Sequence, residues 1–303
     1  MSLEIQQIIN SSFGVSLVSA LGRGIPPWPG HRLSDFVAER ISAQRNSKMV
    51  QAVRANQWVI SGEKLEKVAL DEAVRQTLRN AARSIFDLYH YIHDETATDR
   101  LIVIDQSIQQ LFEHQEFGQR GLVVAGLHIS NFDFVLQALH LRGIQPLVLT
   151  IPDPKGGRRV EFEMRKKTGM NLMPASVTTL RQAIKHLQTG GVVLTGIDRP
   201  IPDAKYHPRF FGRPASLPTH HIYLATRAQV PIMIMVTNLQ PDGRYTVIRS
   251  NPIEMKPYPD RQVEILENAE RVLRIAETFI RKVPHQWTIS LPVWPEALEQ
   301  VPD

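Results

Sequence analysis

The sequence predicts an α/β protein in which a central, mostly parallel sheet is flanked by helices, with a helical region at the N-terminus. Two observations carry this prediction. After Gly121, short apolar runs alternate with amphipathic segments, as is typical of buried parallel strands joined by crossover helices. Before that point, the apolar residues recur every three or four positions, which is the spacing of a helix face.

The individual elements follow from these two patterns. In the N-terminal part, helical periodicity covers residues 32–61 and 69–95. Short apolar runs predict strands at 122–127, 145–151, 191–197 and 230–236. Amphipathic segments predict helices at 131–142, 178–189, 216–228 and 261–282. We expect a C-terminal tail, with Trp287 and Trp294, to pack back on the body. The whole chain, 1–303, is predicted to be a single domain with a helical part at 1–118 and an α/β core at 119–303.

The composition narrows the class of protein. The chain has 303 residues, of which 43% are apolar and 21% charged, so it can bury a sizeable core and is not a disordered chain. It contains no cysteine, which excludes disulfides, thiolate zinc sites and a cysteine nucleophile. Its net charge of +5 favours anionic partners, but the charge alone does not separate nucleic acid, anionic lipid and phosphorylated molecules.

No stretch reaches the roughly 18 uninterrupted apolar residues of a transmembrane helix. The nearest candidate, residues 8–25, is diluted by polar residues and glycines, and the only charge before it is Glu4, so a signal peptide is not expected. Trp28 follows, and then come Arg32, Arg40, Arg45 and Lys48. Two hypotheses remain open: an apolar hairpin that rests in a bilayer interface, or a helix packed on the protein's own core.

A histidine and an aspartate follow the first predicted strand. Residues 121–139 read GLVVAGLHISNFDFVLQAL, and the apolar run ends at His128. Active sites of open α/β sheets gather at such strand ends. Asn131 is expected to cap the next helix, which puts Asp133 in the first turn. Asp133 can then hold one ring nitrogen of His128 and leave the other as a base. The alternative is a buried histidine beside an aspartate that favours the helix dipole.

A second predicted strand ends in the same way. Residues 192–214 read VVLTGIDRPIPDAKYHPRFFGRP, so the apolar run ends at Asp198, with Arg199 next to it. An acid and cations at a second strand end are what a shared active site requires, although a surface loop with salt bridges has the same composition. The chain has no serine in a G-x-S-x-G elbow, so a base that acts directly on a substrate hydroxyl is the simpler scheme.

These motifs resemble a known family. H-I-S-N-F-D at 128–133 is similar to the motif of a histidine, four residues and an acid (HX4D) in the lysophospholipid acyltransferase superfamily. Three further motifs follow in the order and spacing of its bacterial late lipid A acyltransferase branch, near the phosphatidylinositol mannoside acyltransferases: G-I-D-R-P at 196–200, F-F-G-R-P-A at 210–215 and A-T-R-A-Q-V-P-I at 225–232. The resemblance covers roughly residues 45–295 and is strongest over 121–236.

The resemblance implies transfer of a fatty acyl group from a thioester of coenzyme A or acyl-carrier protein to a hydroxyl of a membrane glycolipid or lysophospholipid. It implies His128 as the base, Asp133 as its orienting acid and a positioning or charge-stabilising role for Asp198 and Arg199. Because a thioester is already activated, neither a metal nor another cofactor is expected.

The resemblance also implies a set of substrate-binding residues. Arg165 lies about where the family has an arginine, with Arg158 and Arg159 as rivals for that position. Lys166 and Lys167 are alternative ligands for donor phosphates. We expect Asn131, within the histidine motif, to line the substrate site, and we expect the pocket to be shaped by Phe210, Phe211 and Gly212.

Two differences from the family pattern refine these expectations. Many members carry glutamate where this chain has Asp133. The lipid A branch usually has a clear N-terminal membrane helix, whereas this chain has only the diluted segment 8–25. This favours a peripheral enzyme at the cytoplasmic face of the plasma membrane, on an anionic membrane surface, with a glycolipid acceptor other than lipid A.

Other functional classes fit the same residues less well. An HHxxxDG acyltransferase motif at His220 and His221 is rejected because Ala225 and Thr226 stand where Asp and Gly are needed. The histidine pair is expected on a helix flank, with one ring partly buried. A metal hydrolase using His128, Asp133 and either His140 or Asp198 lacks recognised ligand spacing. A binding protein for nucleic acid or another anionic polymer lacks a recognised motif. A thioesterase or an inactive protein on the same fold remains an alternative.

Overall fold

The computed structural model describes residues 24–302, except for 105, 107, 109, 111–119, 151–161, 164, 167 and 168. Of the segments discussed above, the apolar residues 8–23 and the basic residues Arg158, Arg159 and Lys167 lie outside the described part of the chain.

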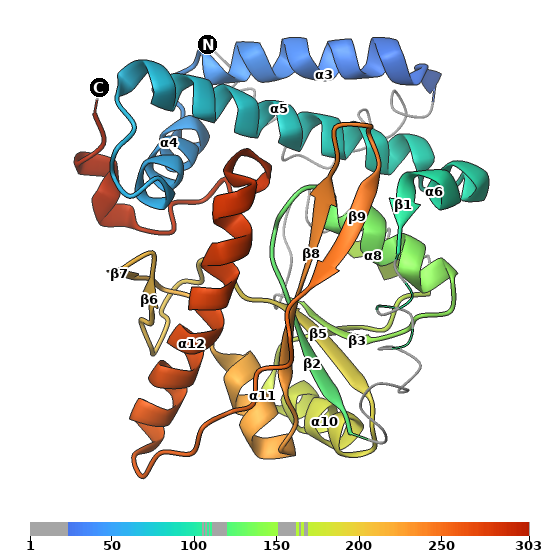
Figure 1. Cartoon of the computed structure of the whole chain (residues 1–303), viewed down its shortest axis with the longest axis vertical. Coiled ribbons are helices and arrows are strands. Elements are labelled where there is room, and N and C mark those ends of the chain that lie inside the picture. Colours follow the sequence, from blue (N-terminus) through green and yellow to red (C-terminus); the bar gives the residue numbers. More distant parts are fainter. Residues whose placement is uncertain are drawn as a thin grey trace.

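A seven-stranded sheet forms the centre of the described structure, with the strand order β1-β9-β8-β2-β5-β3-β4 (Figure 1). Every pair of neighbouring strands is parallel except β8 and β9, which confirms the predicted mostly parallel sheet. The strands are β1 (Ile102–Val103), β2 (Leu122–Gly126), β3 (Leu147–Thr150), β4 (Leu172–Pro174), β5 (Val192–Gly196), β8 (Ile232–Leu239) and β9 (Tyr245–Arg249).

The four predicted strands correspond to β2, β3, β5 and β8. The four predicted helices of the core correspond to α8 (Phe132–Leu141), α10 (Val177–Gln188), α11 (His220–Ala228) and α12 (Arg261–Lys282). Three sheet strands were not predicted, because β1 and β4 have only two or three residues and β9 alternates buried with more exposed positions. A small separate hairpin, β6 (Arg209–Phe210) and β7 (Arg213–Pro214), was not predicted either.

The N-terminal region is helical, as predicted, and consists in its described part of α3 (Pro27–Ser42), α4 (Lys48–Ile60), α5 (Lys67–Tyr91) and α6 (Glu95–Leu101). The periodicity at 32–61 belongs to two helices. The first helix ends at Ser42 and the second begins at Lys48, where the Ser47 side chain caps α4 by accepting a hydrogen bond from Val50 N at 3.3 Å. In Figure 1, α3 lies along α5 on the side away from the sheet.

The core lies on both faces of the sheet. In β2, Val123 and Ala125 face one apolar cluster, whereas Leu122 and Val124 face another, as the alternation of a strand requires. The C-terminal tail packs into the first cluster, as expected, and both Trp287 and Trp294 are buried. It contains two short 3-10 helices, Pro284–Gln286 and Pro295–Glu299. Among the described helices, none combines the length and the apolar character needed to cross a bilayer.

Candidate active site

The sheet register brings the two polar strand ends together. β2 and β5 are parallel neighbours, and Gly126 pairs with Gly196. Two residues beyond each glycine stand His128 and Asp198, so both side chains leave the sheet at the same level. A Cβ atom on Gly196 would lie 3.3 Å from Cε1 of His128, so the absence of a side chain there lets the imidazole lie over β5.

His128 and Asp198 are joined by two hydrogen bonds. The imidazole Nδ1 lies 2.6 Å from Oδ1 of Asp198, and the backbone N–H of His128 donates to Oδ2 at 2.8 Å. Trp287 Nε1 donates to the same Oδ2 at 2.8 Å. Asp198 is 0% exposed, so these groups replace water as its hydrogen-bond partners.

The surroundings of Asp198 keep the carboxylate ionised. Burial on its own raises the pKa of a carboxyl, but the charge of protonated His128 and the hydrogen bonds from His128 and Trp287 together lower the pKa of Asp198 below its ordinary value. An ionised Asp198 can only accept, so Nδ1 of His128 carries a proton in either state of the ring, and in the neutral imidazole Nε2 keeps a lone pair. The His128 side chain is 21% exposed and therefore accessible to a substrate. This arrangement can act as a general base.

The C-terminal tail holds the segment that follows His128. Ile129 and Trp287 form an antiparallel bridge, Ser130 N donates to the carbonyl of Gln286 at 2.7 Å, and Thr288 N donates to the carbonyl of His128 at 3.0 Å. Ser130 adopts a left-handed backbone conformation, with φ of 53°. This is strained for a residue with a Cβ atom, and the strain is maintained by the flanking backbone pairs.

Asp133 does not contact His128, contrary to the geometry expected from the sequence. Its carboxylate makes a two-pronged pair with Arg165, in which Nε donates to Oδ1 and Nη2 to Oδ2, both at 2.8 Å. Gln137 Nε2 also donates to Oδ1, at 3.2 Å. The reason is that Asp133 lies in the first turn of α8 and its carboxylate is directed toward Gln137, one turn further along the same helix. The place beside the imidazole is taken by Asp198.

The sequence of the chain matches one known protein family. The model of the bacterial lipid A biosynthesis acyltransferase family matches residues 4–295. The chain belongs to this family. The match includes the N-terminal helices as well as the α/β core, and it makes the protein an acyltransferase, which implies an acyl donor and a lipid acceptor. A search of curated proteins found no significant match.

Asn131 connects the histidine motif of this acyltransferase to the N-terminal helices. Its Oδ1 accepts a hydrogen bond from Phe134 N at 3.4 Å, which confirms that it caps α8. Its Nδ2 donates to the carbonyl of Ser84 on α5 at 2.8 Å. The buried Asn131 side chain therefore has partners on both sides, and α5 lies against the end of the sheet that carries His128.

The aromatic residues of the F-F-G-R-P-A motif pack against the tail that contacts Asp198. Phe210 is fully buried, with its ring stacked on Trp294 at 5.5 Å and edge-on to Trp287 at 6.1 Å. Phe211 and Gly212 form the left-handed turn of the β6–β7 hairpin, with φ of 50° and 79°. Phe210 therefore contacts the tryptophan that holds Asp198.

Arg199 and Arg159 were also predicted to bind substrate. Arg199 follows Asp198 directly and is partly buried, and Arg159 lies outside the described residues.

Two surface hollows in the described structure, with volumes of about 430 and 530 Å³, are lined by neither His128 nor Asp198. The first lies between α11 and the start of α12, and the second lies beside α12 next to the segment after β9.

The histidine pair of α11 lies beside the strand that carries Asp198. His220 Nε2 is 2.6 Å from the hydroxyl of Thr195 on β5. Loss of hydration lowers the pKa of His220 to about 4, and burial lowers that of His221, with a smaller contribution from His220, to about 3. Both rings are therefore neutral at pH 7. The expected placement on a helix with one partly buried histidine is confirmed, because His220 is of intermediate exposure while His221 is fully buried.

Proposed function

We propose that the protein transfers a fatty acyl group from an acyl thioester, carried by coenzyme A or acyl-carrier protein, to a hydroxyl of a membrane glycolipid or lysophospholipid. The observation that carries this proposal is the imidazole of His128 held through Nδ1 by the buried Asp198, in a chain whose family is that of lipid acyltransferases. The remaining nitrogen, Nε2, is on an imidazole whose side chain is 21% exposed, whereas Asp198 is fully enclosed.

His128 acts as the base in this proposal. Nε2 takes the proton from the acceptor hydroxyl while the hydroxyl oxygen attacks the thioester carbonyl. Asp198 stabilises the imidazolium that forms, because its Oδ1 lies 2.6 Å from Nδ1 and the carboxylate has no surface exposed to solvent. The tetrahedral intermediate then expels the thiolate, the C–S bond breaks, and the imidazolium returns the proton to the sulfur. The products are an ester and a free thiol.

Arg165 is the candidate for stabilising negative charge in this reaction, either on the tetrahedral oxyanion or on donor phosphates. The two-pronged pair with Asp133 fixes the plane of its guanidinium. We therefore assign Asp133 to positioning Arg165 rather than to orienting His128. Asp133 then no longer orients His128, as the resemblance implied, but it still contributes to the reaction through Arg165.

The acceptor in this proposal is a membrane lipid, so the enzyme works at a membrane surface. The net charge of +5 favours an anionic surface. We place the protein peripherally, on the cytoplasmic face of the plasma membrane, where acyl-coenzyme A and acyl-carrier protein are both available.

The experiment is a product analysis with purified protein. Acyl-coenzyme A and acyl-carrier protein thioesters are each incubated with and without vesicles that contain glycolipid or lysophospholipid acceptors, and the products are identified by mass spectrometry. The proposal predicts an acylated lipid that requires both donor and acceptor. Release of free fatty acid at the same rate with or without acceptor would identify a thioesterase instead. The lipid profile of cells lacking the gene identifies the natural acceptor.

A further inference from the structure

Helix α3 exposes apolar side chains to an unusual degree. Within its 16 residues, Trp28 is 70% exposed, Leu33 44% and Phe36 53%. At 100° per residue, these three positions fall within one 140° arc, together with Arg32 and Arg40. We call the surface formed by Trp28, Arg32, Leu33, Phe36 and Arg40 the α3 face. The opposite side of the helix, which packs on α5, is formed by the small or apolar residues Gly30, Ser34, Ala38 and Ile41.

The cations of the α3 face lie against its rings. The Arg32 guanidinium is 5.3 Å from the ring centre of Trp28, and that of Arg40 is 5.0 Å from the ring centre of Phe36. Within the described part of the chain, neither arginine makes an ion pair with an acid. An exposed tryptophan with arginines interleaved is the composition of a surface that meets lipid headgroups and the upper acyl chains.

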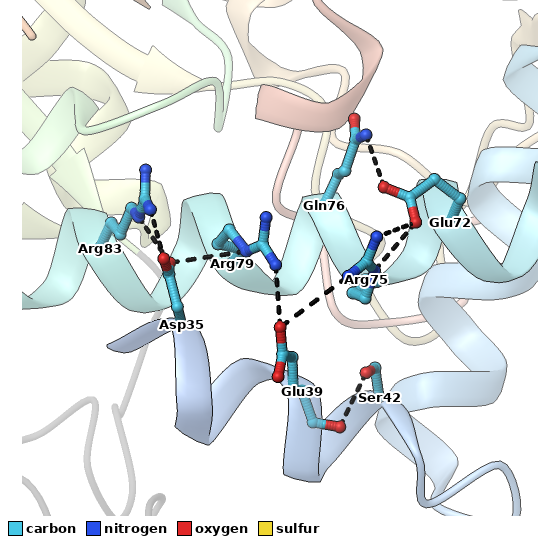
Figure 2. A network of polar contacts seen from close by, with 8 residues as sticks. All are labelled: Asp35, Glu39, Ser42, Glu72, Arg75, Gln76, Arg79 and Arg83. Atoms are coloured by element: carbon cyan, nitrogen blue, oxygen red, sulfur yellow. Dashed lines mark hydrogen bonds and ion pairs between the residues drawn. The ribbon is translucent and has the colours of Figure 1, made fainter. Parts of the chain in front are cut away.

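The acids of α3 reach across to α5, as Figure 2 shows, although Glu39 falls inside the arc of the α3 face and its side chain is half exposed. Asp35 pairs with Arg83 and, at 3.5 Å, with Arg79. Glu39 pairs with Arg79 at 3.0 Å and with Arg75 at 3.8 Å. All three arginines belong to α5. The negative charges of α3 are thus paired with arginines of the neighbouring helix, whereas Arg32 and Arg40 of the α3 face pair with no acid in the described part of the chain.

The α3 face also lies on the correct side of the molecule for the proposed reaction. α5 lies between α3 and the histidine motif: it carries Ser84, whose carbonyl accepts from Asn131, and Asp87, which pairs with His31 of α3 at 2.6 Å. In Figure 1, α3 and α5 form one end of the molecule, on the same side as the carboxyl ends of the parallel strands. A surface in contact with α3 is therefore near the end of the sheet that carries His128.

We propose that the α3 face docks on an anionic lipid bilayer and thereby directs the His128 end of the sheet toward the membrane that holds the acceptor. This deepens the proposed function and rests on it for the identity of the acceptor, but the docking itself can be measured without any turnover. The occupant is the anionic bilayer, because the face combines exposed apolar side chains with two arginines that lie over aromatic rings and are not paired with any acid among the described residues.

Tryptophan fluorescence tests the docking directly, because the other three tryptophans of the chain, Trp58, Trp287 and Trp294, are buried. The full-length protein is mixed with phosphatidylglycerol–phosphatidylcholine vesicles whose phosphatidylcholine is brominated on the acyl chains. The proposal predicts quenching that disappears in Trp28→Phe. Unchanged fluorescence of the wild-type protein on vesicles that bind it would overturn the proposal, because binding would then use another segment, such as residues 1–23.

Vesicle co-sedimentation measures the apolar and the electrostatic contributions to docking separately. Trp28→Ser/Leu33→Ser/Phe36→Ser should weaken binding roughly 100-fold, and the control Val177→Ser/Val263→Ser, which alters exposed apolar residues of α10 and α12, should not. Arg32→Gln/Arg40→Gln should weaken binding to anionic vesicles about 30-fold at low salt, at about fivefold per arginine. The control Arg120→Gln/Arg274→Gln removes two similarly exposed arginines elsewhere. Equal effects of test and control variants would overturn the proposal.

Activity measurements separate the docking proposal from the proposed acyl transfer. The triple α3 variant should lose transfer to an acceptor in vesicles but keep transfer to a short-chain acceptor that is monomeric in solution. If the wild-type protein acylates neither acceptor, the proposed function fails, while the fluorescence and sedimentation results still decide the docking. If the triple variant acylates acceptor in vesicles at the wild-type rate, α3 docking has no part in catalysis and the proposal is wrong.

Discussion

Asp198→Asn should disable the enzyme by fixing the wrong tautomer of His128. Oδ2 of Asp198 accepts two hydrogen bonds, from His128 N and from Trp287 Nε1. Both are donors, so the oxygen of the new amide must take the Oδ2 place and its NH₂ group must face Nδ1 of His128. Nδ1 then has to accept, the proton moves to Nε2, and the base is lost.

The size of the effect follows from the same contacts. Turning the amide over restores the productive tautomer but sacrifices two hydrogen bonds, at about 1–1.5 kcal/mol each, which leaves roughly 1% of molecules productive. Loss of the carboxylate charge beside the imidazolium removes about another factor of 100, because an acid-to-amide change in a catalytic triad costs about 10⁴ in total. We therefore expect kcat to fall about 10⁴-fold with little change in the KM for the donor.

Single-turnover transfer, measured by quenched flow with a radiolabelled acyl thioester, checks this prediction. Nitrogen-15 NMR of the histidines reports the tautomer in the same protein, and circular dichroism reports the fold. A folded Asp198→Asn variant within tenfold of the wild-type rate would refute the reasoning, because the orientation of His128 would then not depend on the carboxylate.

Three further outcomes follow from other contacts. Asp133→Asn removes the charged partner of Arg165 and should lower the free energy of unfolding by about 1–3 kcal/mol in urea titration, with a smaller rate loss than Asp198→Asn; a larger rate loss would return Asp133 to the His128 ring. Ser130→Gly relieves a left-handed backbone and should be about 1 kcal/mol more stable than Ser130→Ala; equal melting curves for the two would show that no strain is stored there. Burial lowers the pKa of His221 to about 3, so the unfolded chain, with a pKa of about 6.5, binds a proton that the folded protein resists. The stability that neutral His221 contributes is therefore complete above pH 6.5 and declines as the pH falls toward 3, by about 2 kcal/mol between pH 7 and 5. His221→Leu should remove this part of the pH dependence of the free energy of unfolding. Parallel pH dependences in the two proteins would contradict the assignment.

The strand ends were predictable from the sequence because each combines a local apolar run with an abrupt polar residue. The two runs share a further signal, a glycine followed two residues later by the polar group, as in Gly126–His128 and Gly196–Asp198. Their pairing was not predictable from either stretch, because the register of β2 and β5 is set by packing across the sheet. The choice of Asp133 as the partner of His128 followed sequence proximity, whereas the observed partner comes from the neighbouring strand.

Local sequence patterns could not predict the contribution of the C-terminal tail to the site either. Trp287 reads as an apolar residue of a packed tail, and it is one. Its indole N–H reaches Asp198 only because the bridge between Ile129 and Trp287 places the tail beside the histidine motif. By contrast, the exposed Trp28 and its nearby arginines were visible in the sequence, although the direction of each side chain required the packing of α3 on α5.

A double-mutant cycle on the single-turnover transfer rate tests the central claim most directly, namely that His128 and Asp198 work as one general base. His128→Ala should lower the rate by about 10²–10⁴, and Asp198→Ala by a similar factor. Because the aspartate acts only through the imidazole, we predict that the double variant transfers within about threefold of His128→Ala alone. A double variant whose loss equals the product of the two single losses would contradict the account, since the two residues would then act independently.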